Sequence, residues 1–146
     1  MLIDVESISL VAMEFMNNTH KEDVEIINEL FELILAYEAS PTLENKKKID
    51  EEYGTWFEHT VEHFRVEEMM MQEKNFPPYP MHKGEHDNAL RIMDEVFRHW
   101  QEKEDIGVLK NYFSDHLVPW LTTHIDTMDT VTARFFHTGV SPCAIH

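Results

Sequence analysis

The stretch HFRVEE, residues 63 to 68, places His63 and Glu67 four positions apart. In an α-helix, residues at this spacing lie one above the other on the same face. His59 stands one turn before His63, so a single helical face would present two imidazoles and a carboxylate. Such a row of ionisable groups in a helix indicates either a network of buried polar contacts or a metal site.

The rest of the chain repeats this helical spacing, and strand-like alternation is absent. Ser40 is the predicted N-cap of the second helix with Pro41 at its first position, and Asp105 is the predicted N-cap of the fourth. Four amphipathic helices with short connections predict an all-α, up-down-up-down four-helix bundle with an N-terminal arm. The predicted helices cover about 18–37, 40–74, a stretch that follows Pro80, and 105–137.

We expect a single domain with three parts. These are the arm over residues 1–17, the bundle over residues 18–137 and a tail over residues 138–146. Pro119 lies inside the fourth helix, where it removes a backbone hydrogen bond and clashes with the preceding turn. A kink, or a helix in two pieces, is therefore expected at this position.

The composition excludes several classes of partner. The formal net charge of −16 at pH 7 argues against nucleic acid and anionic membrane surfaces. No apolar run is long enough to cross a membrane, and the N-terminus lacks the basic segment of a secretory signal. The single cysteine, Cys143, excludes an internal disulfide and a cysteine-rich metal cluster. We therefore expect a soluble, cytoplasmic protein.

The 10 histidines are many for 146 residues, and histidine is the side chain that most often binds metals. Left without partners, this many polar groups in a core would cost several kcal/mol. Either a network of histidines bonded to carboxylates or bound metal ions would satisfy them. The residues predicted to point inward are His20, His63, Glu67, His82, His86, His124 and Asp129.

The number of candidate ligands bears on the choice of metal. One tetrahedral zinc ion needs fewer ligands than this set offers. If both carboxylates and one oxygen atom bridge two six-coordinate ions, these groups fill every position but one. Such a nitrogen-rich site favours iron, with manganese as the alternative. His124 and Asp129 are five residues apart and point in different directions on an α-helix, so they either flank the two metals or require a local bulge.

Four segments make the sequence recognisable. Together they resemble the bacterial branch of the hemerythrin family, the non-haem di-iron oxygen carriers, over about residues 15 to 137. The resemblance implies that the seven residues above are ligands of two iron ions, and that Glu67, Asp129 and an oxo or hydroxo group bridge these ions. The segments are THKEDVEIIN (19–28), HFRVEEMMM (63–71), FPPYPMHKGEH (76–86) and WLTTHIDTMD (120–129).

The resemblance also implies that the two iron ions differ. His82, His86 and His124 would complete one of them. His20 and His63 would serve the other, which would keep its sixth position free for dioxygen. No dedicated side-chain acid is then needed, because the task of the protein is to hold the irons and to keep bulk water out.

Other positions match or depart from the family pattern. Leu121 and Trp120 correspond to residues beside the cluster, whereas the tryptophan usual in the family's arm is absent here. His59 stands where many bacterial members have an aromatic residue. We interpret His59 as bonded to a neighbour beside the ligands, with a half-exposed core residue and an additional ligand as alternatives; as a proton donor it would hasten oxidation of the oxygenated form. Glu68 is expected to be solvated, and His116 to lie at the core edge or to line a channel.

These inferences lead to one predicted function and two alternatives. We expect a binding protein, not an enzyme, that takes up dioxygen reversibly for storage, delivery or sensing. A sensor would need an unidentified redox or signalling partner. The alternatives are an enzyme that reduces peroxide or nitric oxide with the same irons, which His59 favours, and iron storage.

Overall fold

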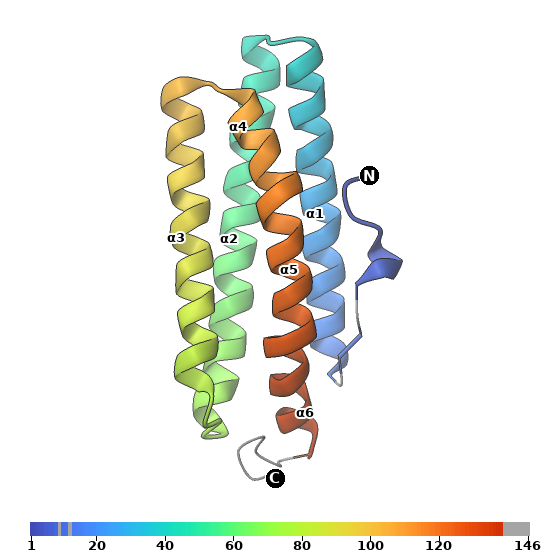
Figure 1. Ribbon diagram of the computed structural model, residues 1–146, viewed down its shortest axis with the longest axis vertical. Helices are drawn as coiled ribbons and strands as arrows, with labels where there is room; N and C mark the ends of the chain where they lie inside the picture. Colours follow the sequence, from blue (N-terminus) through green and yellow to red (C-terminus); the bar gives the residue numbers. More distant parts are fainter. Residues whose placement is uncertain (9, 12, 139–146) are drawn as a thin grey trace.

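The computed structural model describes residues 1–8, 10, 11 and 13–138, and within these ranges the chain contains helices and no strand. Three columns of the bundle are the single helices α1 (Glu14–Ala39), α2 (Leu43–Glu73) and α3 (Tyr79–Lys103). The fourth column stacks α4 (Ile106–Asn111), α5 (Val118–His124) and α6 (Thr130–Thr138) end to end (Figure 1). Successive columns run in opposite directions, which confirms the predicted all-α, up-down-up-down bundle.

Large apolar side chains fill the bundle near the α1–α2 connection. Ile34 and Trp100 are almost completely buried there, and the Tyr53 hydroxyl donates to the carbonyl of Met93 at 2.7 Å. Each fully buried side chain of this size contributes about 1.5–3 kcal/mol. Apolar contacts dominate this half of the bundle, and the predicted ligands lie in the other half. In the described part of the chain, no helix is both long and apolar enough to cross a membrane.

Two helix starts differ from the prediction. Helix α1 begins at Glu14, four residues before the predicted Asn18, because the completely buried Met16 already belongs to the apolar stripe. Helix α2 is capped by Thr42, whose hydroxyl accepts from the backbone N–H of Asn45 at 3.1 Å. Ser40, the predicted cap, instead ends α1. Asp105 caps α4 as predicted, accepting from the N–H of Val108.

The N-terminal arm lies along α1 and contains a short 3₁₀ helix, Val5–Ser7 (Figure 1). Two asparagines of α1 hold it through paired hydrogen bonds to the backbone of one arm residue each. Asn28 binds the N–H and the carbonyl of Ile3, both at 2.7 Å. Asn17 binds Val11 in the same way, at 2.8 and 3.0 Å. The arm is thus docked on the bundle without the tryptophan usual in the family.

The fourth column changes its hydrogen-bond pattern where Pro119 was expected to disturb it. A π-helical turn, Tyr112–Leu117, precedes α5, and the N–H of Val118 donates to the carbonyl of Phe113, five residues back. Pro119 therefore occupies the first turn of α5, where a missing N–H is tolerated. The column continues past the proline. Of the predicted tail only Thr138 falls within the described residues, and Cys143 lies outside them.

Candidate metal centre

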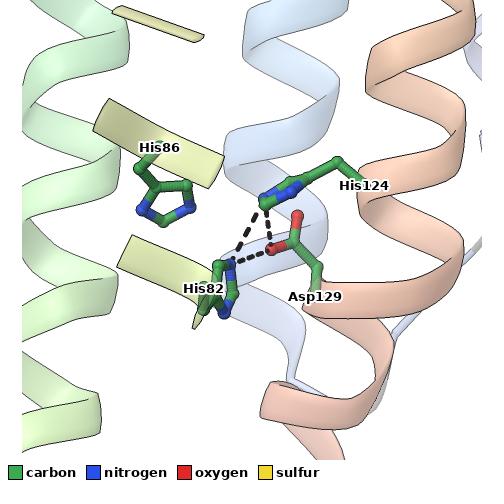
Figure 2. A group of neighbouring side chains, drawn as sticks. All are labelled: His82, His86, His124 and Asp129. Atoms are coloured by element: carbon green, nitrogen blue, oxygen red, sulfur yellow. Dashed lines mark hydrogen bonds and ion pairs between the residues drawn. The ribbon is translucent and has the colours of Figure 1, made fainter. Parts of the chain in front are cut away.

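Four buried side chains from the third and fourth columns converge in the polar half of the bundle. His82, His86, His124 and Asp129 each offer one ligand atom, and these atoms lie within 4.8 Å of one another (Figure 2). The Oδ1 atom of Asp129 is 3.0 Å from Nε2 of both His82 and His124. One metal ion at the centre of this group would be within reach of every member.

A second group faces the first from α1 and α2. The Nε2 atom of His20 lies 2.9 Å from Oδ2 of Asp129, the oxygen not used by the first group. His63 Nε2 lies 3.0 Å from Oε2 of Glu67, while Oε1 of Glu67 is 4.0 Å from Nε2 of His82. Each carboxylate therefore presents one oxygen to each group of imidazoles. The structure brings all seven predicted residues together.

Several of these converging atoms have no hydrogen bond. They include Nε2 of His63 and of His86, both carboxylate oxygens of Glu67, and Oδ1 of Asp129. The contact between His63 and Glu67 is short, yet it lacks the direction of a hydrogen bond. Buried polar atoms without partners are rare in native proteins because they cost free energy. A nitrogen and oxygen donor set aimed at common points fits metal ions.

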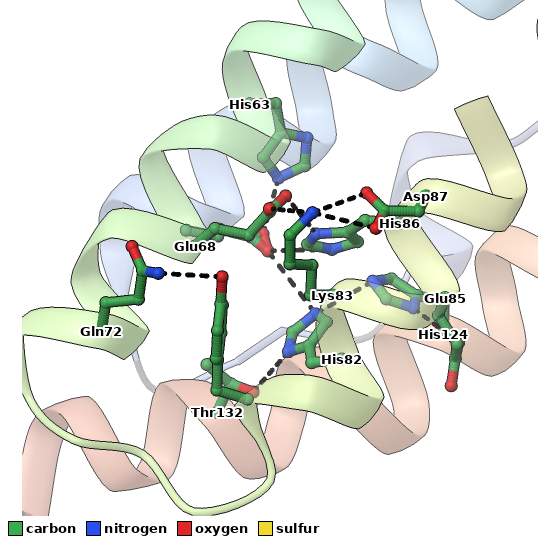
Figure 3. A network of polar contacts seen from close by, with 12 residues as sticks. His63, Glu68, Gln72, His82, Lys83, Glu85, His86, Asp87, His124 and Thr132 are labelled. Carbon is green, nitrogen blue, oxygen red and sulfur yellow. Dashed lines mark hydrogen bonds and ion pairs between the residues drawn. The ribbon is translucent and has the colours of Figure 1, made fainter. Parts of the chain in front are cut away.

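In the first group, the ring nitrogens that face away from the cluster are held by other side chains (Figure 3), whereas Nδ1 of His20 and of His63 has no hydrogen-bond partner among the described residues. An outer bond is usual for histidines that bind metals, because it fixes the ring and its tautomer. The pairs are His82 with Thr132 at 2.8 Å, His86 with Glu68 at 3.1 Å and His124 with Glu85 at 2.9 Å.

These outer partners were not predicted from the sequence. Glu68 was expected to be solvated, but its side chain is only 17% exposed, because it packs against α3 between His86 and Lys83. Glu85 and Thr132 lie at no regular helical spacing from the residues they hold. No periodicity could have revealed them, since the pairs form across helices.

A π-helical turn places His124 and Asp129 on the same helical face although they are five residues apart. The turn covers Ile125–Asp129, and the N–H of Thr130 donates to the carbonyl of Ile125, five residues back. The Thr130 hydroxyl donates to the same carbonyl at 2.7 Å. Because a π-helical turn carries one more residue than an α-helical turn, positions five apart come onto the same face. The local bulge considered from the sequence is present, and it turns Asp129 inward.

Burial and the neighbouring carboxylates shift the pKa values of the histidines in this cluster in opposite directions. Burial lowers the pKa of His86 to about 2, with His82 and His124 adding to the effect, so this imidazole stays neutral. Burial also opposes the charged form of His124, but the adjacent carboxylate of Asp129 outweighs it and raises the pKa to about 9. The imidazoles of His124 and His20 in turn hold the pKa of Asp129 well below its usual value. Without metal, a proton on His124 balances the buried carboxylate, and a metal ion would displace it.

A cavity of about 230 Å³ adjoins the second group. His20 and His63 line it, and of the first group His124 and Asp129 do so as well, whereas His82 and His86 do not. Its walls are mainly apolar, and they include the predicted pocket residues Leu121 and Trp120, the latter stacked on His124 with ring centroids 4.6 Å apart. Exposed His116 also lines the cavity, in agreement with the channel alternative.

The structure places His59 beside this cavity and not in it. Its side chain is 23% exposed and lies in a separate surface hollow lined also by Glu22 and Glu62. The Nδ1 atom of His59 is 3.6 Å from Oδ1 of Asp23, a buried residue that does line the cavity. Asp23 was missed in the sequence, although it stands three residues after His20 and so shares its helical face.

Comparisons with known proteins agree with this geometry. The hemerythrin HHE cation binding domain matches residues 11–135, and the chain belongs to the hemerythrin family. It is 28% identical over 134 residues to a bacteriohemerythrin of Aquifex aeolicus (strain VF5), an alignment that covers 92% of this chain and 97% of that protein. A bacteriohemerythrin of Pseudomonas aeruginosa (strain PAO1 among others) is 30% identical over 118 residues, covering 80% of this chain and 70% of the relative. No solved structure matches the chain. The family and the buried His/Asp cluster together point to a metal centre.

Proposed function

We propose that the chain holds two iron ions and binds dioxygen reversibly at one of them. The observation that carries this proposal is the division of the seven side chains into two unequal groups that share two carboxylates. In this arrangement Glu67 and Asp129 would hold both irons, together with an oxo or hydroxo group. The remaining ligands are His82, His86 and His124 for one iron, and His20 and His63 for the other.

The unequal division supports a vacancy on the second iron. His20 and His63 offer one donor fewer than the other group, and both line the 230 Å³ cavity. A small ligand can therefore reach this side of the centre without displacing a protein side chain. The pair of irons, when bound, supplies the electrons that dioxygen accepts reversibly.

The walls of the cavity favour binding over further reaction. Trp56, Met93 and Leu121 are buried around it and limit the entry of bulk water. Excluding water slows the loss of reduced oxygen species, because their release needs protons. We infer that this domain acts in the storage, delivery or sensing of dioxygen.

Metal analysis combined with optical spectra tests the proposal. We expect about two iron ions per chain, and a visible band that appears when oxygen is added to the dithionite-reduced protein and disappears under argon over repeated cycles. His63→Ala should lose iron and the band, whereas His99→Ala, which removes an exposed histidine of α3, should retain both. An iron-replete protein that shows no oxygen-induced band would contradict the proposal.

A further inference from the structure

Asp23 is a buried carboxylate that the proposed centre does not use. Its side chain is 8% exposed and lines the cavity together with His20 and His63. Its Oδ1 atom has no hydrogen-bond partner among the described residues. Burying a carboxylate without such a partner costs free energy. A polar group of this kind inside a mainly apolar cavity calls for a functional explanation.

His59 connects Asp23 with the surface. One ring nitrogen, Nδ1, lies 3.6 Å from Oδ1 of Asp23, and the other, Nε2, lies 3.4 Å from Oε2 of Glu22. The Glu22 side chain is 64% exposed, His59 is 23% exposed and Asp23 is 8% exposed. The three groups thus form a graded path from solvent to the cavity. A shift of about 0.5 Å would bring His59 and Asp23 within hydrogen-bond distance.

We propose that Glu22, His59 and Asp23 form a proton relay that leads from solvent to the cavity beside His20 and His63. The relay rests on the proposed dioxygen binding and sets how fast that state is lost to hydrogen peroxide. The overall reaction is 2 Fe²⁺ + O₂ + 2 H⁺ → 2 Fe³⁺ + H₂O₂, in which the irons give two electrons and solvent gives two protons. His59 accepts a proton at Nε2 and passes one from Nδ1 to Asp23, which delivers it into the cavity.

The surroundings of His59 suit this role. The nearby carboxylate of Asp23 raises the pKa of His59, burial lowers it and Glu22 raises it again, with a net rise. The other ionisable groups that face it are Glu62 and His63 of its own helix, the latter acting to lower the pKa. An imidazole can receive a proton at one ring nitrogen and donate one from the other.

The relay is tested by following the decay of the oxygen-induced band and the formation of hydrogen peroxide after reduced protein is mixed with oxygen. Asp23→Asn and His59→Phe should slow both by about ten-fold or more, since a placed proton donor accelerates such steps strongly. Glu62→Gln is the matched control, because this carboxylate lines the same surface hollow but pairs with Arg65. Added imidazole should restore the rate of His59→Ala by occupying the space that the ring leaves.

A second measurement does not depend on oxygen. In the zinc-loaded, diamagnetic protein, an NMR titration should give His59 a pKa above its usual value, and Asp23→Asn should lower it. Equal decay rates in wild type, Asp23→Asn and His59→Phe, or a His59 pKa unaffected by Asp23→Asn, would overturn the relay while leaving dioxygen binding intact. A wild-type protein without any oxygen-induced band would overturn the proposed function and the relay together.

Discussion

Replacing Thr132 by valine removes the hydroxyl that holds His82 and keeps the volume of the side chain. Thr132 is 1% exposed, and its Oγ1 atom lies 2.8 Å from Nδ1 of His82. The substitution leaves this ring nitrogen buried without a partner, which costs about 1–3 kcal/mol. Loss of such an outer partner usually lowers metal affinity roughly 10- to 100-fold, equivalent to about 1.4–2.8 kcal/mol. We therefore expect Thr132→Val to bind ferrous iron at least ten-fold more weakly.

Anaerobic competition with a chelator of known affinity measures this effect. Thr127→Val is the matched control, because Thr127 lies on the same column but is exposed and bonds only to the carbonyl of Thr123. Thr132→Ser should recover most of the affinity, since it keeps the hydroxyl. If Thr132→Val retained iron as tightly as Thr127→Val, the outer hydrogen bond would not orient His82, and this reasoning would be wrong.

Three further predictions follow from the same contacts. Below about pH 9 His124 carries a proton when no metal is bound, so iron binding should release protons and apparent affinity should rise with pH up to that value; pH-stat titration measures the release, and a pH-independent affinity would argue against it. Asn28→Ala removes two hydrogen bonds to Ile3 and should expose the arm, seen as faster amide exchange before Val11, while iron content stays unchanged. Tyr53→Phe should lower the free energy of unfolding by about 1–2 kcal/mol in denaturant titrations, because the buried carbonyl of Met93 loses its donor; an unchanged midpoint would contradict this.

The buried candidate ligands show which positions helical periodicity can predict from the sequence. The inward-facing positions of His63, Glu67, His82 and His86 followed from their four-residue spacing, since side chains at this spacing share a helical face. The bundle itself followed from four apolar stripes with short connections. These inferences succeed because both depend on local helical geometry.

Local geometry does not fix the helix boundaries, which is why one predicted N-cap is incorrect. Ser40 and Thr42 are both good N-cap residues, and sequence alone could not show that Ser40 would end α1 while Thr42 bonds to Asn45. The alternatives differ by only two residues. Their choice depends on how α1 and α2 are joined, which is set by packing between the helices.

By itself, the sequence determined the bundle, the arm and the inward-facing positions of His63, Glu67, His82 and His86, because helical periodicity places side chains on faces without reference to the rest of the molecule. Only the tertiary structure showed that a π-helical turn brings Asp129 onto the face of His124. It also showed that Glu68 is largely buried and bonds to His86, and that Asp23 lines the cavity. These features depend on contacts between helices and on hydrogen bonds five residues apart, which the regular α-helical period does not encode.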